Sequence, residues 1–149
     1  METPQYVDWF RSTSPYINAH RGKTFVLATS GAAVAHANFT NIAQDIVLLH
    51  SLGVRLLIVH GAKPQISAQL QLSGIGARRV EGLRVTDQQA LPHVIASVGQ
   101  VRAEIEALLT AGVVQPSQRG HSVRVVGGNF VTAKPIGVQY GVDFEHTGE

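Results

Sequence analysis

Apolar residues follow two different periods along the chain, and the change of period predicts its elements. Short apolar runs at residues 24–27 and 56–59 predict two strands. The second run is aliphatic, partly β-branched and without a polar position, which is typical of a strand buried on both faces of a parallel sheet. From Asn38 to Gly53 the apolar residues recur at helical spacing. Asn38 or Thr40 is the expected N-cap, and Gly53 the expected residue just past the helix.

Two more helices follow the second strand. The first is expected to begin at Pro64, since proline is favoured in the first turn, and to end at Ser73-Gly74. The second is a long amphipathic helix that ends before Gly112. The run Thr86-Asp-Gln-Gln89 matches a capping box. Pro92 lies too far inside a helix that begins at Asp87, so this helix is expected to begin later or to be bent.

The two ends of the chain carry weaker patterns. Thr3-Pro4 predicts the start of an N-terminal helix, which Ser14-Pro15 is expected to interrupt or restart. Residues 123–133 predict a hairpin that turns at Gly127-Gly128. The tail from Lys134 has no periodicity and reads as loop plus a short strand.

The order of strand, helix, strand, helix, helix and hairpin predicts an α/β fold with three layers and a mainly parallel sheet. Only two strong parallel strands are visible, and the last segment does not close the sheet. We therefore expect these residues to form one half of a larger domain.

Composition narrows the possible functions. The chain has 149 residues, 44% of them hydrophobic, which suits one domain with a substantial core. The net charge is +2 and no Lys/Arg cluster appears, so no nucleic-acid surface is expected. There is no cysteine, no apolar run long enough to span a membrane and no signal peptide, so a cytoplasmic protein is expected.

The residues after the second strand form the strongest candidate site. His60-Gly61-Ala62 is a tight exit from the strand, and the helix that follows points its free N–H groups at whatever lies beyond. Lys63 adds a positive charge, which makes an anion the natural ligand, although an exposed, solvated lysine is the plainer interpretation. The small-residue turn of residues 28–33 includes Gly31 and lets a ligand approach closely, but it is not a P-loop.

Several motifs together resemble the amino-acid kinase-like domain of bacterial N-acetylglutamate synthases. They are residues 25–31, 45–57, 59–66, 82–87, 128–137 and 141–148. The resemblance covers the chain from Tyr6 onward. The pair of motifs at residues 60–61 and 84–87 alone also fits acetylglutamate kinases.

The resemblance implies a regulatory module. In that family, acetyl transfer from acetyl-CoA to glutamate, the first step of arginine biosynthesis, belongs to a separate C-terminal acetyltransferase domain. The kinase-like domain assembles the subunits and binds arginine as feedback inhibitor. Residues 1–22 are then an N-terminal helical segment for oligomerisation, and residues 23–149 are the first half of the kinase-like domain, with the acetyltransferase domain absent.

The first turn departs from the kinases, which place lysine and then Gly-Gly there. This chain has Ala28 at the lysine position and Ser30 at the first glycine position. An alanine cannot stabilise a transferring phosphoryl group. The synthases also lack the lysine, but they usually keep Gly-Gly. A working ATP-dependent acetylglutamate kinase and a structural fragment without a ligand remain the alternatives.

The candidate residues follow from these arguments. The resemblance places Arg84 at an acyl-amino-acid carboxylate and gives Tyr16 a contact with arginine, and Asn129 either lines the same pocket or supports its turn. Tyr6, Trp9 and Phe10 lie on a helix that either packs on its own domain or pairs with a second subunit. No catalytic residue, metal site or cofactor of this chain is expected, since the seven histidines lack metal-ligand spacing. Acetyl-CoA is a co-substrate of the longer enzyme only.

Overall fold

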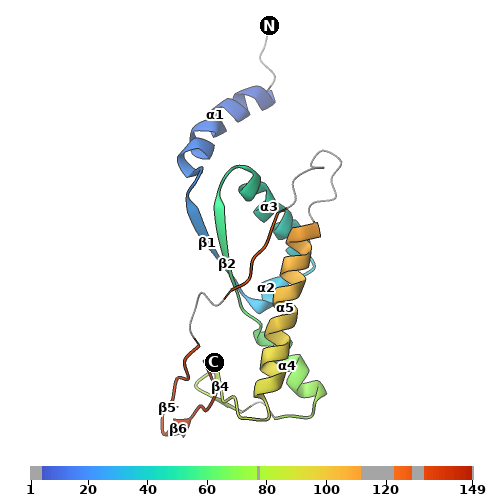
Figure 1. Cartoon of the computed structure of the whole chain (residues 1–149), viewed down its shortest axis with the longest axis vertical. Coiled ribbons are helices and arrows are strands. Elements are labelled where there is room, and N and C mark those ends of the chain that lie inside the picture. The colour runs from blue at the N-terminus through green and yellow to red at the C-terminus, as the bar shows by residue number, and fades with distance from the viewer. Residues whose placement is uncertain (1–4, 77, 112–122, 129–132, 149) are drawn as a thin grey trace.

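The computed structural model describes residues 5–76, 78–111, 123–128 and 133–148. The molecule is elongated (Figure 1). Helix α1 (Gln5–His20) lies at one end, and the last two short strands, β5 and β6, lie at the other.

The central sheet pairs β1 (Thr24–Thr29) with β2 (Arg55–His60) in parallel. The backbone N–H of Arg55 donates to the Lys23 carbonyl at 2.9 Å, and that of Gly61 donates to the Thr29 carbonyl at 2.8 Å. Both predicted strands are therefore present, and each is longer than its apolar run.

Burial alternates along both strands because helices cover only one face of the sheet. Leu27, Leu56 and Ile58 pack against the core on the covered face. On the other face Val26 and Val59 are 63% and 48% exposed. The prediction that β2 is buried on both faces is wrong for the described residues, since no described element lies over the second face.

Three helices form the covering layer: α2 (Gly31–Val34), α3 (Phe39–Ser51) and α5 (Leu91–Ala111). Helix α4 (Lys63–Leu72) packs against α5 and α2 at the end where the strands stop. The core is made by buried side chains of α3 and α5 and by Ala62, which precedes α4: Phe39, Ala43, Ile46, Val47, Ala62, Val101, Ile105 and Leu109.

The helix boundaries confirm some of the end signals and correct others. Asn38 is the N-cap residue of α3, although its side chain makes no capping bond, and Gly53 follows the helix with φ of 91°. Helix α5 begins at Leu91, which places Pro92 in its first turn. The predicted capping box is wrong, because Thr86 is buried and bonds elsewhere, while Asp87 Oδ1 accepts the Ala90 N–H at 2.8 Å.

Helix α1 continues through Pro15, so the predicted interruption is wrong. The hydroxyls of Thr13 and Ser14 donate to the carbonyls of Trp9 and Phe10, at 2.8 and 3.0 Å. Such bonds back to the preceding turn bend a helix.

Two short hairpins complete the described structure. Strands β3 (Arg79–Val80) and β4 (Leu83–Arg84) turn at Glu81-Gly82, and β5 (Val138–Gln139) and β6 (Val142–Asp143) turn at Tyr140-Gly141. All four turn residues have positive φ, as type I′ turns require. In the predicted hairpin, residues 123–128 run without strand pairing, and residues 129–132 lie outside the described part of the chain.

Candidate functional site

The turns that follow β1 and β2 touch each other backbone to backbone. A Cβ on Gly31 would lie 2.6 Å from Gln65 Oε1 and 2.8 Å from Ala62 Cα. A Cβ on Gly61 would lie 3.2 Å from the Gly31 nitrogen. Glycine is therefore required at position 31 by close packing within the chain, and any larger residue there must displace a neighbour.

The side chain of Gln65 fills this corner. Its Nε2 donates to the Gly31 carbonyl at 2.7 Å. Ser30 Oγ accepts the Ala33 N–H at 3.1 Å and so begins α2. The small-residue turn expected to admit a ligand is thus occupied by the chain itself, and residues 28–34 bring no charge to it.

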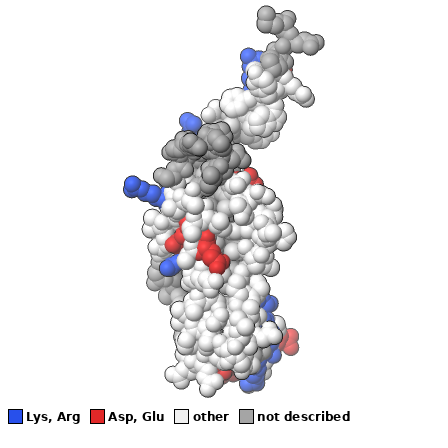
Figure 2. Space-filling view, turned by 90° about the vertical axis from the view of Figure 1, so that its right-hand side faces the viewer, with Lys and Arg blue, Asp and Glu red and all other residues white. Residues whose placement is uncertain are grey.

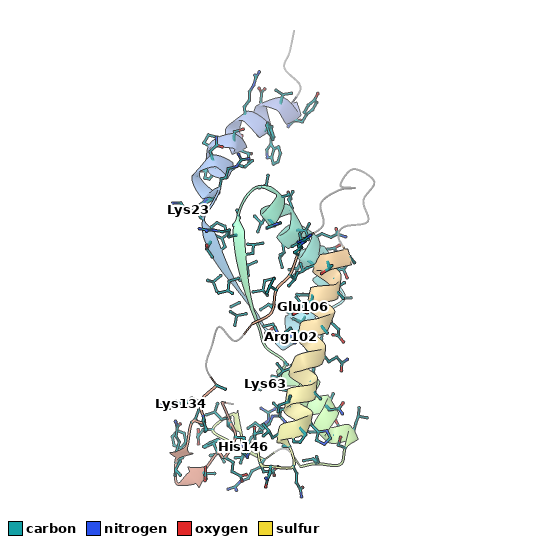
Figure 3. The ribbon with its side chains drawn as sticks, viewed as in Figure 1. Lys23, Lys63, Arg102, Glu106, Lys134 and His146 are labelled. Carbon is teal, nitrogen blue, oxygen red and sulfur yellow. The ribbon has the colours of Figure 1, made fainter. Side chains whose placement is uncertain are left out.

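Lys63 begins α4 directly after the buried residue Ala62. Its ammonium-bearing side chain is exposed at the lower part of the molecule, beside α4 and α5 (Figure 3). Its carbonyl accepts the Ser67 hydroxyl at 2.9 Å, one turn along the helix. Lys63 is thus free to meet an anion from solvent.

Two guanidinium groups converge on Ser67. Arg84 Nη2 donates to Ser67 Oγ at 2.8 Å, and Arg79 Nη2 donates to the same oxygen at 3.2 Å. Burial, and secondly the charge of Arg79, lower the pKa of Arg84 from its ordinary value. The two cations are adjacent in the β3–β4 hairpin, and neither forms an ion pair with a described acidic residue.

Three buried side-chain atoms in the described part of the chain lack a hydrogen-bond partner. They are His60 Nδ1, Gln65 Oε1 and Arg84 Nη1. His60 ends β2, Gln65 lies in the first turn of α4, and Arg84 contacts the next turn through Ser67. Such atoms are costly unless water or a ligand satisfies them. Of the three atoms, Arg84 Nη1 is a cationic donor, and with Lys63 exposed on α4 it favours a small anion such as a carboxylate. Gln65 Oε1 is an acceptor and needs a donor instead.

Thr147 holds the Arg84 motif in place from far along the chain. Its hydroxyl donates to the Arg84 carbonyl at 2.5 Å, and it accepts the Thr86 N–H at 3.1 Å. No motif in the sequence indicated the supporting roles of Thr147, Ser67, Gln65 and Arg79. The spacing of four residues places Lys63 and Ser67 on one side of the same helix, and Thr147 lies within the motif of residues 141–148, but neither pattern indicates a contact with Arg84.

The remaining predicted residues lie apart from this corner. Helix α1, with Tyr16, is at the opposite end of the molecule from α4 (Figure 1). Its four large aromatic side chains are all exposed: Tyr6, Trp9, Phe10 and Tyr16. Asn129 lies outside the described residues. Within the described residues no three His, Asp or Glu side chains gather as a metal site.

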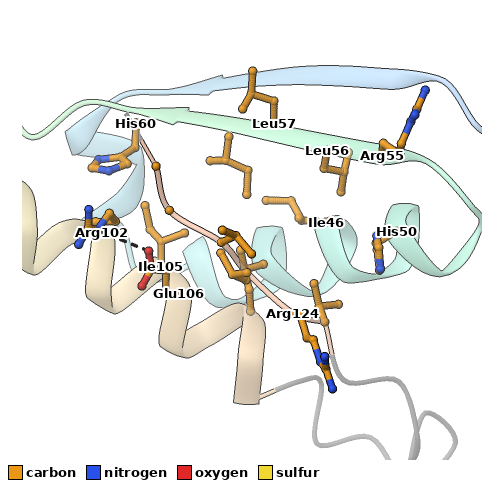
Figure 4. Close-up of a pocket in the computed structure, with 17 residues that line it drawn as sticks. Ile46, His50, Arg55, Leu56, Leu57, His60, Arg102, Ile105, Glu106 and Arg124 are labelled. Carbon is orange, nitrogen blue, oxygen red and sulfur yellow. Dashed lines mark ion pairs between the residues drawn. The ribbon is translucent and has the colours of Figure 1, made fainter. Parts of the chain in front are cut away.

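A cavity of about 450 Å³ lies between β2, α3, α5 and residues 123–128 (Figure 4). Its floor is aliphatic, and its rim carries the ion pair between Arg102 Nε and Glu106 Oε1, 3.4 Å apart. His60 lines it, but none of the described residues predicted as a binding site does.

The surface charge and the helix lengths concern two expectations from the sequence, that there is no nucleic-acid surface and no membrane span. On the face drawn in Figure 2, Lys and Arg side chains are scattered rather than gathered into a basic patch. None of the helices in the described residues is long and apolar enough to cross a membrane.

Comparison with known proteins supports the resemblance drawn from the motifs. Residues 23–143 match the model of the amino acid kinase family. The chain is 54% identical, over 98% of its length, to an amino-acid acetyltransferase of Pseudomonas syringae pv. syringae, and 53% identical to one of Pseudomonas aeruginosa PAO1. It spans 34% of the length of each of these relatives.

A solved structure agrees. The N-acetylglutamate synthase of Neisseria gonorrhoeae, crystallised with coenzyme A and L-arginine, superposes with a TM-score of 0.80 and 38% identity over 95% of this chain and 33% of that one. The same synthase with coenzyme A and N-acetylglutamate gives a TM-score of 0.76 at 37% identity, over 94% of this chain and 31% of that one. The predicted α/β fold of amino-acid kinase type, and the resemblance to N-acetylglutamate synthases, are confirmed. The chain belongs to the amino acid kinase family.

Proposed function

We propose that this chain is a regulatory and assembly part of an N-acetylglutamate synthase and has no catalytic activity of its own. Its similarity to amino-acid acetyltransferases over 98% of its length supports the parent enzyme. Its span of about a third of those relatives supports a partial role, because acetyl transfer requires residues that this third need not contain.

One observation supports the non-catalytic part of the proposal. The turn that follows β1 carries no charged residue and is packed against Ala62 and Gln65. Phosphoryl transfer is catalysed by cations placed around the transferring group. Here the turn after β1 offers Ser30 and Gly31, with Gln65 packed against them. This argues against the alternative of a working acetylglutamate kinase.

The cationic residues around Ser67 fit a site that binds an anion for regulation, or a site that has lost its catalytic role. Arg84, Arg79 and Lys63 supply positive charge without a described acidic partner. These three cations suit the recognition of a carboxylate, whereas the turn after β1 supplies no charge. A structural fragment that binds no ligand is the remaining alternative.

Helix α1 supports the assembly role. None of its residues is buried, and its aromatic side chains face solvent within this chain. Exposed apolar patches of this kind mark contacts between proteins. We propose that α1 pairs with another subunit, and that arginine is the effector of the assembled enzyme, as it is a ligand of the Neisseria gonorrhoeae synthase.

Two assays on the purified chain test the proposal. Incubation with acetyl-CoA and glutamate should release no thiol above buffer, and incubation with labelled ATP and N-acetylglutamate should transfer no phosphate. The Neisseria gonorrhoeae synthase is the positive control for the first reaction. Sustained protein-dependent turnover in the first assay contradicts the non-catalytic role, and turnover in the second establishes the kinase alternative.

A further inference from the structure

Residues 133–148 form a small lobe beside the β3–β4 hairpin, at the end of the molecule away from α1 (Figure 1). Strands β5 and β6 pair within this lobe, and its residue Phe144 is 0% exposed. The backbone N–H of Ile136 donates to the Thr147 carbonyl at 2.9 Å. The side chain of Thr147 is therefore carried by a part of the chain that is itself folded.

Thr147 and its neighbours pair with the residues around Arg84. The Thr147 hydroxyl donates to the Arg84 carbonyl at 2.5 Å and accepts the Thr86 N–H at 3.1 Å. The His146 N–H donates to the Thr86 carbonyl at 3.0 Å, and Thr86 and Glu145 form a parallel β-bridge. Because Thr86 is buried, its N–H takes the Thr147 hydroxyl as its acceptor in place of water.

Two hydrogen bonds set the position of Arg84, one at each end of the residue. Thr147 holds its carbonyl, and Ser67 Oγ accepts its Nη2 at 2.8 Å. Next to it, the Val85 N–H donates to the Arg78 carbonyl at 2.9 Å. Arg84 Nη1 is buried and has no hydrogen-bond partner among the described residues. The nitrogen that remains for an anion is therefore directed by contacts at both ends of Arg84.

The direction of this guanidinium matters because of the way arginine binds a carboxylate. The planar group offers N–H donors in a fixed fork, and two bonds form only when the fork and the carboxylate are aligned. An arginine that is held in place before the ligand arrives also loses less side-chain freedom on binding. Without the Thr147 hydroxyl, the Arg84 carbonyl and the Thr86 N–H would lose their partner, and the backbone that carries the guanidinium would shift.

We infer that Thr147 is a positioning residue of the anion site around Arg84. Its hydroxyl fixes the backbone of residues 84–86, and through that backbone it fixes the direction of the Arg84 guanidinium. The inference rests on the proposed function, because it adds a residue to the anion site proposed there. The alternative is a purely structural role, in which loss of the hydroxyl lowers stability but leaves the affinity of the folded chain for an anion unchanged.

NMR of the intact, isotope-labelled chain tests the inference, with N-acetylglutamate as the carboxylate probe. The Arg84 Nε–H signal, assigned with the variant Arg84→Lys, reports the surroundings of the guanidinium. Thr147→Val replaces the hydroxyl with a methyl group of similar size. It should shift the Arg84 signal in the absence of ligand. It should also weaken N-acetylglutamate binding roughly tenfold, equivalent to ~1.4 kcal/mol.

Two further variants separate a positioning role from a structural one. Thr147→Ser keeps the hydroxyl and should bind the probe as the unmodified chain does. Thr110→Val is the matched control, because the exposed Thr110 hydroxyl bonds to the Glu106 carbonyl within α5, and it should change neither the signal nor the affinity.

The outcomes distinguish this inference from the proposed function. An unchanged affinity or an unchanged Arg84 signal in Thr147→Val overturns the inference, and so does a Thr147→Ser variant that binds as weakly as Thr147→Val. If the unmodified chain does not bind N-acetylglutamate, the proposed anion site fails. The Arg84 signal of the variants without ligand then decides alone whether Thr147 positions the guanidinium.

Hydrogen exchange of the unmodified chain gives a second test that holds even if Thr147→Val does not fold. Coupling between two sites is reciprocal, so an anion bound at Arg84 should stabilise the contact with the lobe. Saturating N-acetylglutamate should slow exchange of the His146 amide roughly tenfold. The Gly22 amide, which donates to the Gly53 carbonyl at 2.8 Å before the start of β1, should not change. No slowing at His146 overturns the inference.

Discussion

Arg84 and Ser67 are joined by a hydrogen bond of 2.8 Å from the guanidinium Nη2 to the hydroxyl oxygen. The bond fixes the β3–β4 hairpin to the second turn of α4. Because the same oxygen accepts Arg79, one serine holds two cations close together. Ser67 therefore fixes the positions of the Arg79 and Arg84 guanidinium groups.

Ser67→Ala should lower the free energy of unfolding by about 1–3 kcal/mol, since it leaves a half-buried guanidinium with a further unsatisfied N–H. Urea unfolding measures the change. Ser51→Ala is the matched control, because Ser51 bonds only within its own helix and is exposed. Equal effects of the two substitutions would show that the Arg84 bond contributes nothing.

Gly31→Ala should destabilise the fold by about 1–3 kcal/mol, as overpacking does, because its Cβ meets Gln65 Oε1 and the Ala62 backbone. Gly99→Ala is the control. Gly99 lies exposed in α5 with nothing within 4 Å of its added Cβ, so alanine should stabilise the helix by about 0.5–1 kcal/mol. Thermal unfolding should show a lower midpoint for Gly31→Ala and a higher midpoint for Gly99→Ala than for the unmodified chain. Equal changes in the two midpoints would contradict the close packing around Gly31.

The local pattern predicted the strands, most helix ends and the fold class, because each depends on neighbouring residues. Hydrophobic runs located β1 and β2, and Gly53 marked the end of α3. The interruption expected at Pro15 was wrong because proline only disfavours a helix interior, and the structure continues α1 through it. The exposed second face of β2 could not be foreseen either, since burial depends on what covers the sheet.

The site was predictable only in part for the same reason. Lys63 and Arg84 lie within motifs that the sequence shows. In the structure Lys63 begins α4, and Arg84 bonds to Ser67 of the same helix. Thr147 supports Arg84 from 63 residues away, and contacts at such separation leave no local signal. The closure of the Gly31 turn by Gln65 likewise depends on packing between two turns 34 residues apart.

Ala28→Lys should not create kinase activity. Ala28 lies opposite Val59 on the sheet face that the described helices do not cover, and one restored charge does not supply a nucleotide site. Transfer of labelled phosphate to N-acetylglutamate is the assay, with Val26→Lys on the same face as control. Phosphate transfer by the Ala28→Lys variant alone would revive the kinase alternative.

Arginine should bind this chain weakly or not at all. Tyr16, the proposed contact, is 70% exposed, and Asp8 on the same helix already pairs with Arg11 at 3.8 Å. Two or three missing charged hydrogen bonds, each worth ~1.5–3 kcal/mol, weaken binding by roughly two to six orders of magnitude. Calorimetric titration of arginine into the purified chain measures this affinity. Saturable micromolar binding that Tyr16→Ala abolishes would place the arginine site within this chain.

Sedimentation velocity most directly tests the central claim, that this chain serves assembly through α1. The intact chain should form an oligomer that the double variant Trp9→Ala, Phe10→Ala dissociates, since burial of each aromatic contributes ~1.5–3 kcal/mol. The control Val138→Ala, Tyr140→Ala removes equally exposed side chains from the β5–β6 hairpin and should leave the oligomer intact. Identical monomers for the intact chain and the α1 variant at the same concentrations would contradict the account.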